Sequence, residues 1–207
     1  MTMRGPTAAD LQTTLARQVE TLAARVKPYA PPDWAAPSAR PGATNADVLA
    51  ALAALLDALA QGVELRDKPT RPQSEPPRRP SDAGLSVVLS SIGGRLVDLL
   101  RSTDAAALVW HPRFRFSART MSALALAEVV LHRWDVTGPG DRGPEPRAAR
   151  LVLQGLFASR DDSGASPVAL LLHLTGRARI EGRPGWGGDG WGWEFPDEAV
   201  DHRAEDE

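Results

Sequence analysis

A carboxylate and an imidazole stand four residues apart, at Glu128 and His132, in a stretch that reads Glu-Val-Val-Leu-His-Arg-Trp-Asp. The stretch closes the segment 117–136, which contains no Gly or Pro and carries apolar residues at helical spacing. On a helix, side chains four residues apart leave the same face about one turn from each other. Burying either group without a partner costs about 1–3 kcal/mol or more. The spacing therefore predicts a structural pair, a metal site or an acid–base site.

The structural interpretation of the pair is an ion pair that lines a helix bundle. Such a pair can persist as structure, because a neighbouring carboxylate raises the pKa of a histidine and each pKa unit is worth about 1.4 kcal/mol. After His132 on the same segment, Trp134 is expected to pack, and Asp135 to support a ligand or close the helix end. His173 lies in an apolar run, which favours a satisfied core histidine, and the Trp-rich stretch 186–193 is interpreted as packing.

Composition narrows the class of protein. The chain has 207 residues, a formal net charge of −2 and a sequence pI near 6.1, and no dense basic stretch that would suit nucleic acid. The absence of cysteine excludes disulfides, thiolate metal sites and a cysteine nucleophile. No signal-like segment opens the chain, and the longest apolar run, 48–56, is too short to span a membrane. The sequence therefore predicts a cytoplasmic protein without nucleic-acid or membrane partners, with a composition that suits a GC-rich bacterial genome.

Four segments carry apolar residues at helical spacing. The first follows a capping box at Thr7 and ends at Pro28, the second spans 46–62 after a capping box at Thr44, the third runs from about 81 to 101, and the fourth is 117–136. Gly93 and Gly94 interrupt the third segment at a cost of roughly 1 kcal/mol each relative to Ala, and they permit a kink or a close helix approach. Four such helices joined by loops predict an antiparallel four-helix bundle.

The remaining segments give the expected domain map. The Pro-rich connection 28–41 contains Trp34 as a possible anchor, and 106–110 suits a short strand. After the bundle, 147–159 and 167–174 are expected to be helices. The tail is expected to hold a hairpin, 177–181 with 191–195, before an acidic end. We therefore expect a four-helix bundle in 1–140 and a small C-terminal α/β appendage in 141–207.

The segment 67–80 is expected to be a mobile loop, because it is rich in Pro and charge and offers no apolar stripe. Limited proteolysis followed by mass spectrometry of the fragments should therefore find the first internal cut there. A first cut inside the second or the fourth helical segment would contradict the whole element assignment.

Three stretches carry a family resemblance: Pro41-Gly42-Ala43-Thr44, residues 127–136, and residues 174–184. On these the chain resembles the mycothiol-dependent maleylpyruvate isomerase family, whose N-terminal part is a DinB-like four-helix bundle. The resemblance implies a mainly α fold. It also implies a divalent metal, commonly zinc, held by one histidine of the second helix and by the glutamate and histidine of the later helix. The metal would bind mycothiol as a thiolate that attacks an unsaturated small molecule.

Residue by residue, Glu128 and His132 match the second and third ligands that the resemblance implies. The first ligand that the resemblance implies, a histidine, is missing from this chain. Ala51 stands at its position, and no histidine occurs between residues 1 and 110. Catalytic zinc usually has three protein ligands and one open position. The loss of one protein ligand should lower zinc affinity at least as much as the loss of an outer-shell group, which typically lowers it by roughly 10–100-fold. Of the other side chains, Asp47 and His111 are the plausible substitutes.

Three functions follow from these residues. The first is an enzyme, or former enzyme, of isomerase or thiol-transferase ancestry with a degenerate metal site. The second keeps a pocket and drops the metal, so that Glu128 and His132 act as an acid–base pair on a small molecule. The third is a non-catalytic module that binds a small molecule or a protein. Metal analysis separates the first from the others; the substrate and the oligomeric state do not follow from the sequence.

Overall fold

The computed structural model describes residues 5–65, 84–111, 114–137, 144–156 and 166–175. The described chain is mainly helical, and a short antiparallel hairpin lies between its fourth and fifth helices. In chain order the elements are α1 (Ala8–Val26), α2 (Pro31–Ala35), α3 (Asn45–Glu64), α4 (Leu85–Ser102), β1 (Leu108–Trp110), β2 (Arg115–Ser117), α5 (Ala118–Thr137), α6 (Pro146–Leu156) and α7 (Pro167–Leu174).

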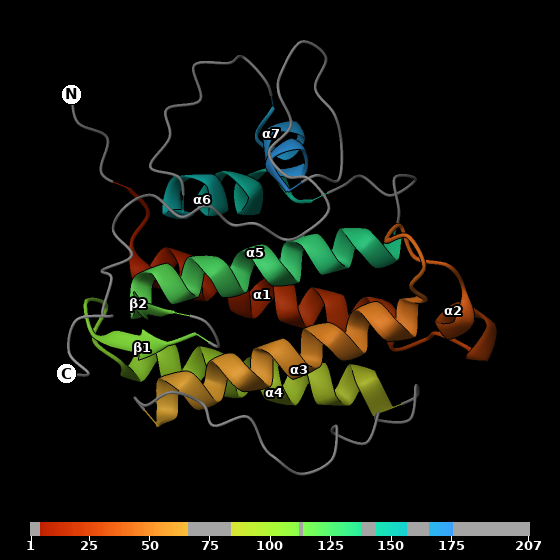
Figure 1. Ribbon diagram of the computed structural model, residues 1–207, viewed down its shortest axis with the longest axis horizontal. Helices are drawn as coiled ribbons and strands as arrows, with labels where there is room; N and C mark the ends of the chain where they lie inside the picture. The colour runs from red at the N-terminus through yellow and green to blue at the C-terminus, as the bar shows by residue number, and fades with distance from the viewer. Residues whose placement is uncertain (1–4, 66–83, 112–113, 138–143, 157–165, 176–207) are drawn as a thin grey trace, which may run out of the picture.

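The long helices α1, α3, α4 and α5 form the expected four-helix bundle, in which α1 and α3 each pack against both α4 and α5 (Figure 1). α1 and α4 run antiparallel, since Gln12 near the start of α1 donates to the carbonyl of Leu100 near the end of α4. α3 and α5 are also antiparallel, because Ala39, shortly before α3, donates to the carbonyl of Asp135 near the end of α5. The pairs α1/α5 and α3/α4 point the same way (Figure 1). The DinB-like mainly α fold is thus confirmed, with antiparallel packing in two of these four neighbouring pairs.

α5 is the central helix of the described structure. It is buried along almost its whole length and on every side, which is typical of a helix without an amphipathic pattern. The bundle covers one side of α5, and α6 covers the other, with α7 packed on α6 (Figure 1). A Cβ added at Gly155 of α6 would lie 2.8 Å from the Cβ of Ala123, so the two helices touch closely. α6 therefore completes the core around α5.

A capping box marks the start of α3. The backbone N–H of Asp47 donates to the Thr44 hydroxyl, and the Asp47 carboxylate accepts from the backbone N–H and the hydroxyl of Thr44, which together form a capping box. By length and hydropathy α3 could also cross a membrane. In this fold it is a core helix, because its apolar stripe packs against α4 and α5.

Several local predictions are confirmed, and two elements were missed. The capping boxes at Thr7 and Thr44 and the strand within 106–110 are present, and Trp34 is an anchor, 3% exposed, whose indole donates to the carbonyl of Tyr29. The short helix α2 and the strand β2 were not predicted. Both are too short for periodicity to reveal them. The expected loop 67–80 and the expected strands 177–181 and 191–195 lie outside the described residues, and the division at residue 140 stays a prediction.

Candidate functional site

Glu128 and His132 are both buried inside the bundle. Their exposed fractions are 8% and 3%, and the Nδ1 atom of His132 lies 3.4 Å from Oε2 of Glu128. His132 follows Ala123 by nine residues, which is half a turn around the helix, and Ala123 touches α6. The imidazole therefore points away from α6 and into the bundle. The pair is buried, as expected from its shared face.

The main chain fixes the ring of His132. Nδ1 lies 2.8 Å from the carbonyl oxygen of Glu128, one turn earlier in α5. A carbonyl only accepts hydrogen bonds, so this contact places the proton of the neutral ring on Nδ1. Nε2 is then the basic nitrogen of the neutral imidazole. The sequence spacing predicted the side-chain pair but gave no sign of this main-chain contact.

Ala51 lies on the exposed outer side of α3. On this helix, Asp57 and Glu64 mark the side toward α4, because both bind Arg95 of α4. Ala50 is seven residues before Asp57 and shares that side, whereas Ala51 is rotated by about 100° from Ala50. The alanine at the expected ligand position is thus exposed, does not share the side of Ala50, and supplies no donor atom.

Neither proposed substitute completes a metal site. The carboxylate of Asp47 belongs to the cap of α3, where Oδ2 accepts two hydrogen bonds from Thr44. His111 follows β1 at the opposite end of the bundle from the end of α5; its ring lies edge-on to Phe116, with ring centroids 5.8 Å apart. His132 is roughly 20 Å further along the axis of α5 than the β2 end at which the helix begins. Among the described residues, no three His, Asp or Glu side chains lie close enough together to hold a metal ion.

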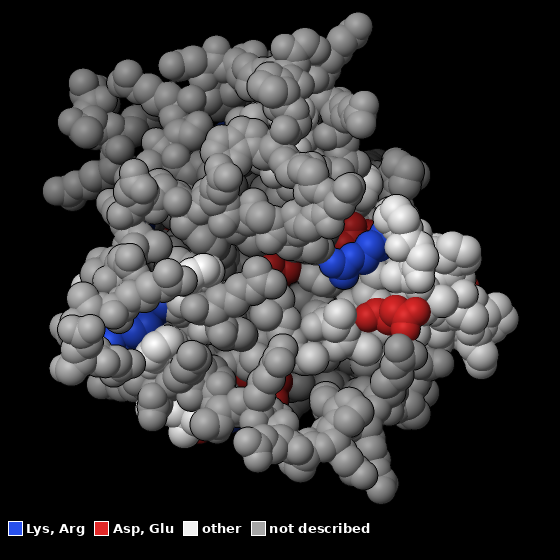
Figure 2. All heavy atoms as spheres, viewed as in Figure 1, with Lys and Arg blue, Asp and Glu red and all other residues white. Residues whose placement is uncertain are grey.

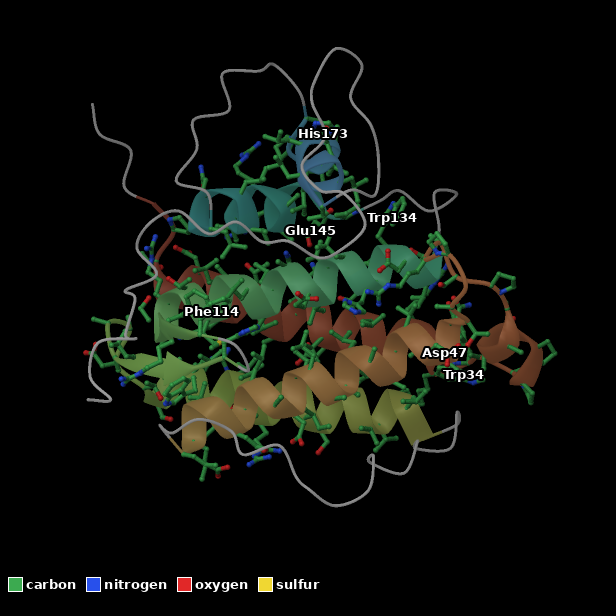
Figure 3. The ribbon with its side chains drawn as sticks, viewed as in Figure 1. Trp34, Asp47, Phe114, Trp134, Glu145 and His173 are labelled. Carbon is green, nitrogen blue, oxygen red and sulfur yellow. The ribbon has the colours of Figure 1, made fainter. Side chains whose placement is uncertain are left out.

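The structure places His173 on α7, and Trp134 and Asp135 near the end of α5. His173 is buried in α7, which packs on α6 rather than within the bundle (Figure 3). Trp134 is partly buried against the core, as expected for a packing residue. Asp135 is buried, and its carbonyl holds the loop before α3. His202 and the Trp-rich stretch 186–193 lie outside the described residues.

A polar network was missed by sequence reasoning. Arg17 and Gln18 of α1, Arg133 of α5 and Glu145 before α6 are joined by hydrogen bonds. The partners are more than a hundred residues apart in sequence, so no spacing pattern could have linked them. On the face drawn in Figure 2, the charged side chains of the described residues lie in small separate groups.

An open hollow of about 400 Å³ lies in the loop 37–44 that leads into α3. Its lining consists of that loop alone and includes neither Glu128 nor His132. Gly42 at the turn of this loop has φ +75°, a conformation that favours glycine. The hollow is a feature of the loop backbone and brings no titratable pair together.

Two comparisons with known proteins point to the same family. The family model described as the mycothiol maleylpyruvate isomerase N-terminal domain matches residues 15–137. No curated protein matches the chain. The crystal structure of a histidine-to-alanine mutant of mycothiol-dependent maleylpyruvate isomerase matches with a TM-score of 0.54 and 18% identity, over 72% of this chain and 70% of that chain. The structural match shows a shared fold, and the family model covers more than half of the sequence. The chain therefore belongs to the mycothiol maleylpyruvate isomerase N-terminal domain family.

Proposed function

We propose that this chain is a small-molecule enzyme of maleylpyruvate isomerase ancestry whose metal site is degenerate. The observation that carries the proposal is the buried pair of Glu128 and His132, kept on α5 while Ala51 stands at the position of the first ligand. A carboxylate beside an imidazole is costly to bury inside a bundle, because desolvation opposes any charge on either group. The burial of the two groups side by side supports a chemical role for the pair.

The described residues do not fit the three-ligand zinc site that the resemblance implies. Glu128 and His132 supply one carboxylate and one imidazole. The carboxylate of Asp47 caps α3, and the ring of His111 lies beside Phe116 at the other end of the bundle. A catalytic zinc usually has three protein ligands. The proposed chemistry therefore uses neither a metal nor a metal-bound thiol, and it is carried by the side chains themselves.

The pair can hold and move one proton. The carbonyl of Glu128 keeps the Nδ1–H of His132 in place, so Nε2 accepts a proton from a bound molecule or, once protonated, returns it. The carboxylate of Glu128, 3.4 Å from Nδ1, stabilises the imidazolium that forms. Burial strengthens this interaction, because the local dielectric is low. A positioned acid–base group contributes typically about 10²–10⁴-fold to a rate.

The ligand class that suits this arrangement is a small molecule with an exchangeable or activated proton, bound in a cytoplasmic protein. Maleylpyruvate, the substrate in the names of the family and of the matched structure, is the first compound to test. The alternative is a binding module with the same ligand and no turnover. It has the same supporting observation, and turnover separates the two.

We expect chelator-treated protein to isomerise maleylpyruvate without added metal, and His132→Gln to lose about 10²–10⁴ of the rate, because glutamine cannot accept the proton. Glu128→Gln should lose less, since the carbonyl that orients the ring remains. The measurement is the absorbance change of the substrate, with and without mycothiol, and thermal unfolding of each variant confirms that it folds. Glu20→Gln, an exposed position on α1, is the matched control.

Each outcome decides between the candidates. A rate that appears only with added zinc would contradict a metal-free mechanism. Equal rates for His132→Gln and Glu20→Gln would remove the pair from the chemistry. A rise in melting temperature with maleylpyruvate but no turnover would favour the binding module, since a ligand of the folded state raises stability by mass action.

A further inference from the structure

The carboxylate of Glu145 is bound by two side chains of α1, one of which also accepts a hydrogen bond from a side chain of α5. Nη2 of Arg17, on α1, lies 2.6 Å and 2.7 Å from its two oxygens. Nε2 of Gln18, also on α1, donates to Oε2 at 2.6 Å. Nη1 of Arg133, on α5, donates to Oε1 of Gln18 at 3.2 Å. The carboxylate of Glu145 therefore binds the guanidinium of Arg17 directly. It also accepts from the amide of Gln18, which the guanidinium of Arg133 orients.

The orientation of the Gln18 amide is what makes this arrangement specific. Gln18 is 2% exposed, and its oxygen faces Arg133. An amide whose oxygen accepts from a guanidinium turns its nitrogen the other way, so the buried N–H donor points at the carboxylate. Arg17 is about half exposed, and its ion pair alone would contribute little. The buried amide adds a fixed donor that a surface ion pair lacks.

The donors and the carboxylate belong to different parts of the fold. Arg17, Gln18 and Arg133 stand on α1 and α5, inside the segment matched by the family model. Glu145 precedes α6, and its carbonyl accepts the N–H of Ala149, the first turn of that helix. The contact therefore fastens the start of α6, which covers α5, to the bundle. These side chains of α1 and α5 thus form a binding site, and the side chain of Glu145 occupies it.

We propose that Arg17, Gln18 and Arg133 form a carboxylate-binding site on the bundle, with Glu145 as its resident intramolecular ligand. Charge-assisted hydrogen bonds to guanidinium and to a fixed amide are the interactions that a carboxylate needs. When the side chain of Glu145 is removed, the same donors should bind a small monocarboxylate. The site shares α5 with Glu128 and His132 but uses none of their atoms, so it stands independently of the proposed function.

The test is chemical rescue of Glu145→Ala by acetate. The variant should melt at a lower temperature than the unaltered chain, because the donors of the buried amide and of Arg17 lose their acceptor. Sodium acetate at constant ionic strength should then raise its melting temperature saturably by roughly 2–4 °C. The unaltered chain should not respond, because Glu145 already fills the site. Differential scanning fluorimetry with acetate replacing chloride gives the measurement.

Three further variants make the result specific. Glu20→Ala removes an exposed glutamate of α1 and should not respond to acetate. Glu145→Ala combined with Arg17→Ala should lose the rescue. Glu145→Gln fills the same space and should remain unresponsive to acetate. If Glu145→Ala fails to fold, Glu145→Ser, which also lacks the carboxylate, takes its place in the acetate test. An equal acetate response in the unaltered chain or in Glu20→Ala, a rescue that persists without Arg17, or a Glu145→Ala variant with unchanged melting temperature would each overturn the proposal.

Discussion

Replacing Ala51 by histidine should raise the zinc bound by the purified protein from well under one ion per chain toward one. The unaltered chain offers Glu128 and His132 as donors near one another, and two protein ligands are fewer than a catalytic zinc site usually has. Ala51 stands at the position of the family's first ligand, and its exposure means that a longer side chain meets no packing there. A third ligand should increase zinc affinity by at least the roughly 10–100-fold that outer-shell changes produce. Elemental analysis of untagged protein and competition with a zinc indicator measure the change.

Ala50→His is the matched control for this substitution. Ala50 is the neighbouring alanine at the same level of α3, but it lies on the side that faces α4. It should leave the zinc content unchanged. Full zinc occupancy of the unaltered chain would contradict the degenerate site and return attention to Asp47 and His111. Equal zinc in both histidine variants would mean that the gain came from surface binding.

The two adjacent glycines of α4 should respond to alanine with opposite signs. A Cβ at Gly93 would lie 2.5 Å and 2.9 Å from the methyl carbons of Val19 on α1, and a β-branched side chain cannot easily turn away. Gly93→Ala should therefore destabilise the chain by about 1–3 kcal/mol through overpacking. A Cβ at Gly94 meets nothing within 4 Å, so Gly94→Ala should stabilise by about 0.5–1 kcal/mol through helix propensity.

Urea unfolding followed by circular dichroism measures both glycine variants under one set of conditions. Each glycine serves as the control of the other, because they share the helix and its solvent. Destabilisation of both variants by the same amount would mean that α4 needs flexibility at this point rather than a close approach to α1. The sequence indicated either a kink or a close approach, and the structure places the close approach at Gly93 alone of the two.

Local chemistry made the helix starts predictable. A capping box needs only the Thr and the Asp three residues later, so Thr7 and Thr44 marked α1 and α3 from the sequence. The pairing of Glu128 with His132 was equally local, because helical spacing fixes it. Contacts between distant segments could not be found in this way. The Gln18 amide, the carbonyl that orients His132 and the outward position of Ala51 depend on how helices pack, which a single sequence does not encode in any short pattern.

The burial of α5 on every side has a consequence for synthesis. The helix ends at Thr137, where the family match also ends, and α6 begins nine residues later, at Pro146. A nascent chain that has released α5 but not α6 from the ribosome presents an apolar surface around Ala123 to water. Folding of the bundle can close this surface only after α6 emerges. α6 therefore covers this part of α5 late in synthesis, and a chain truncated at Thr137 would leave the apolar face around Ala123 exposed to water.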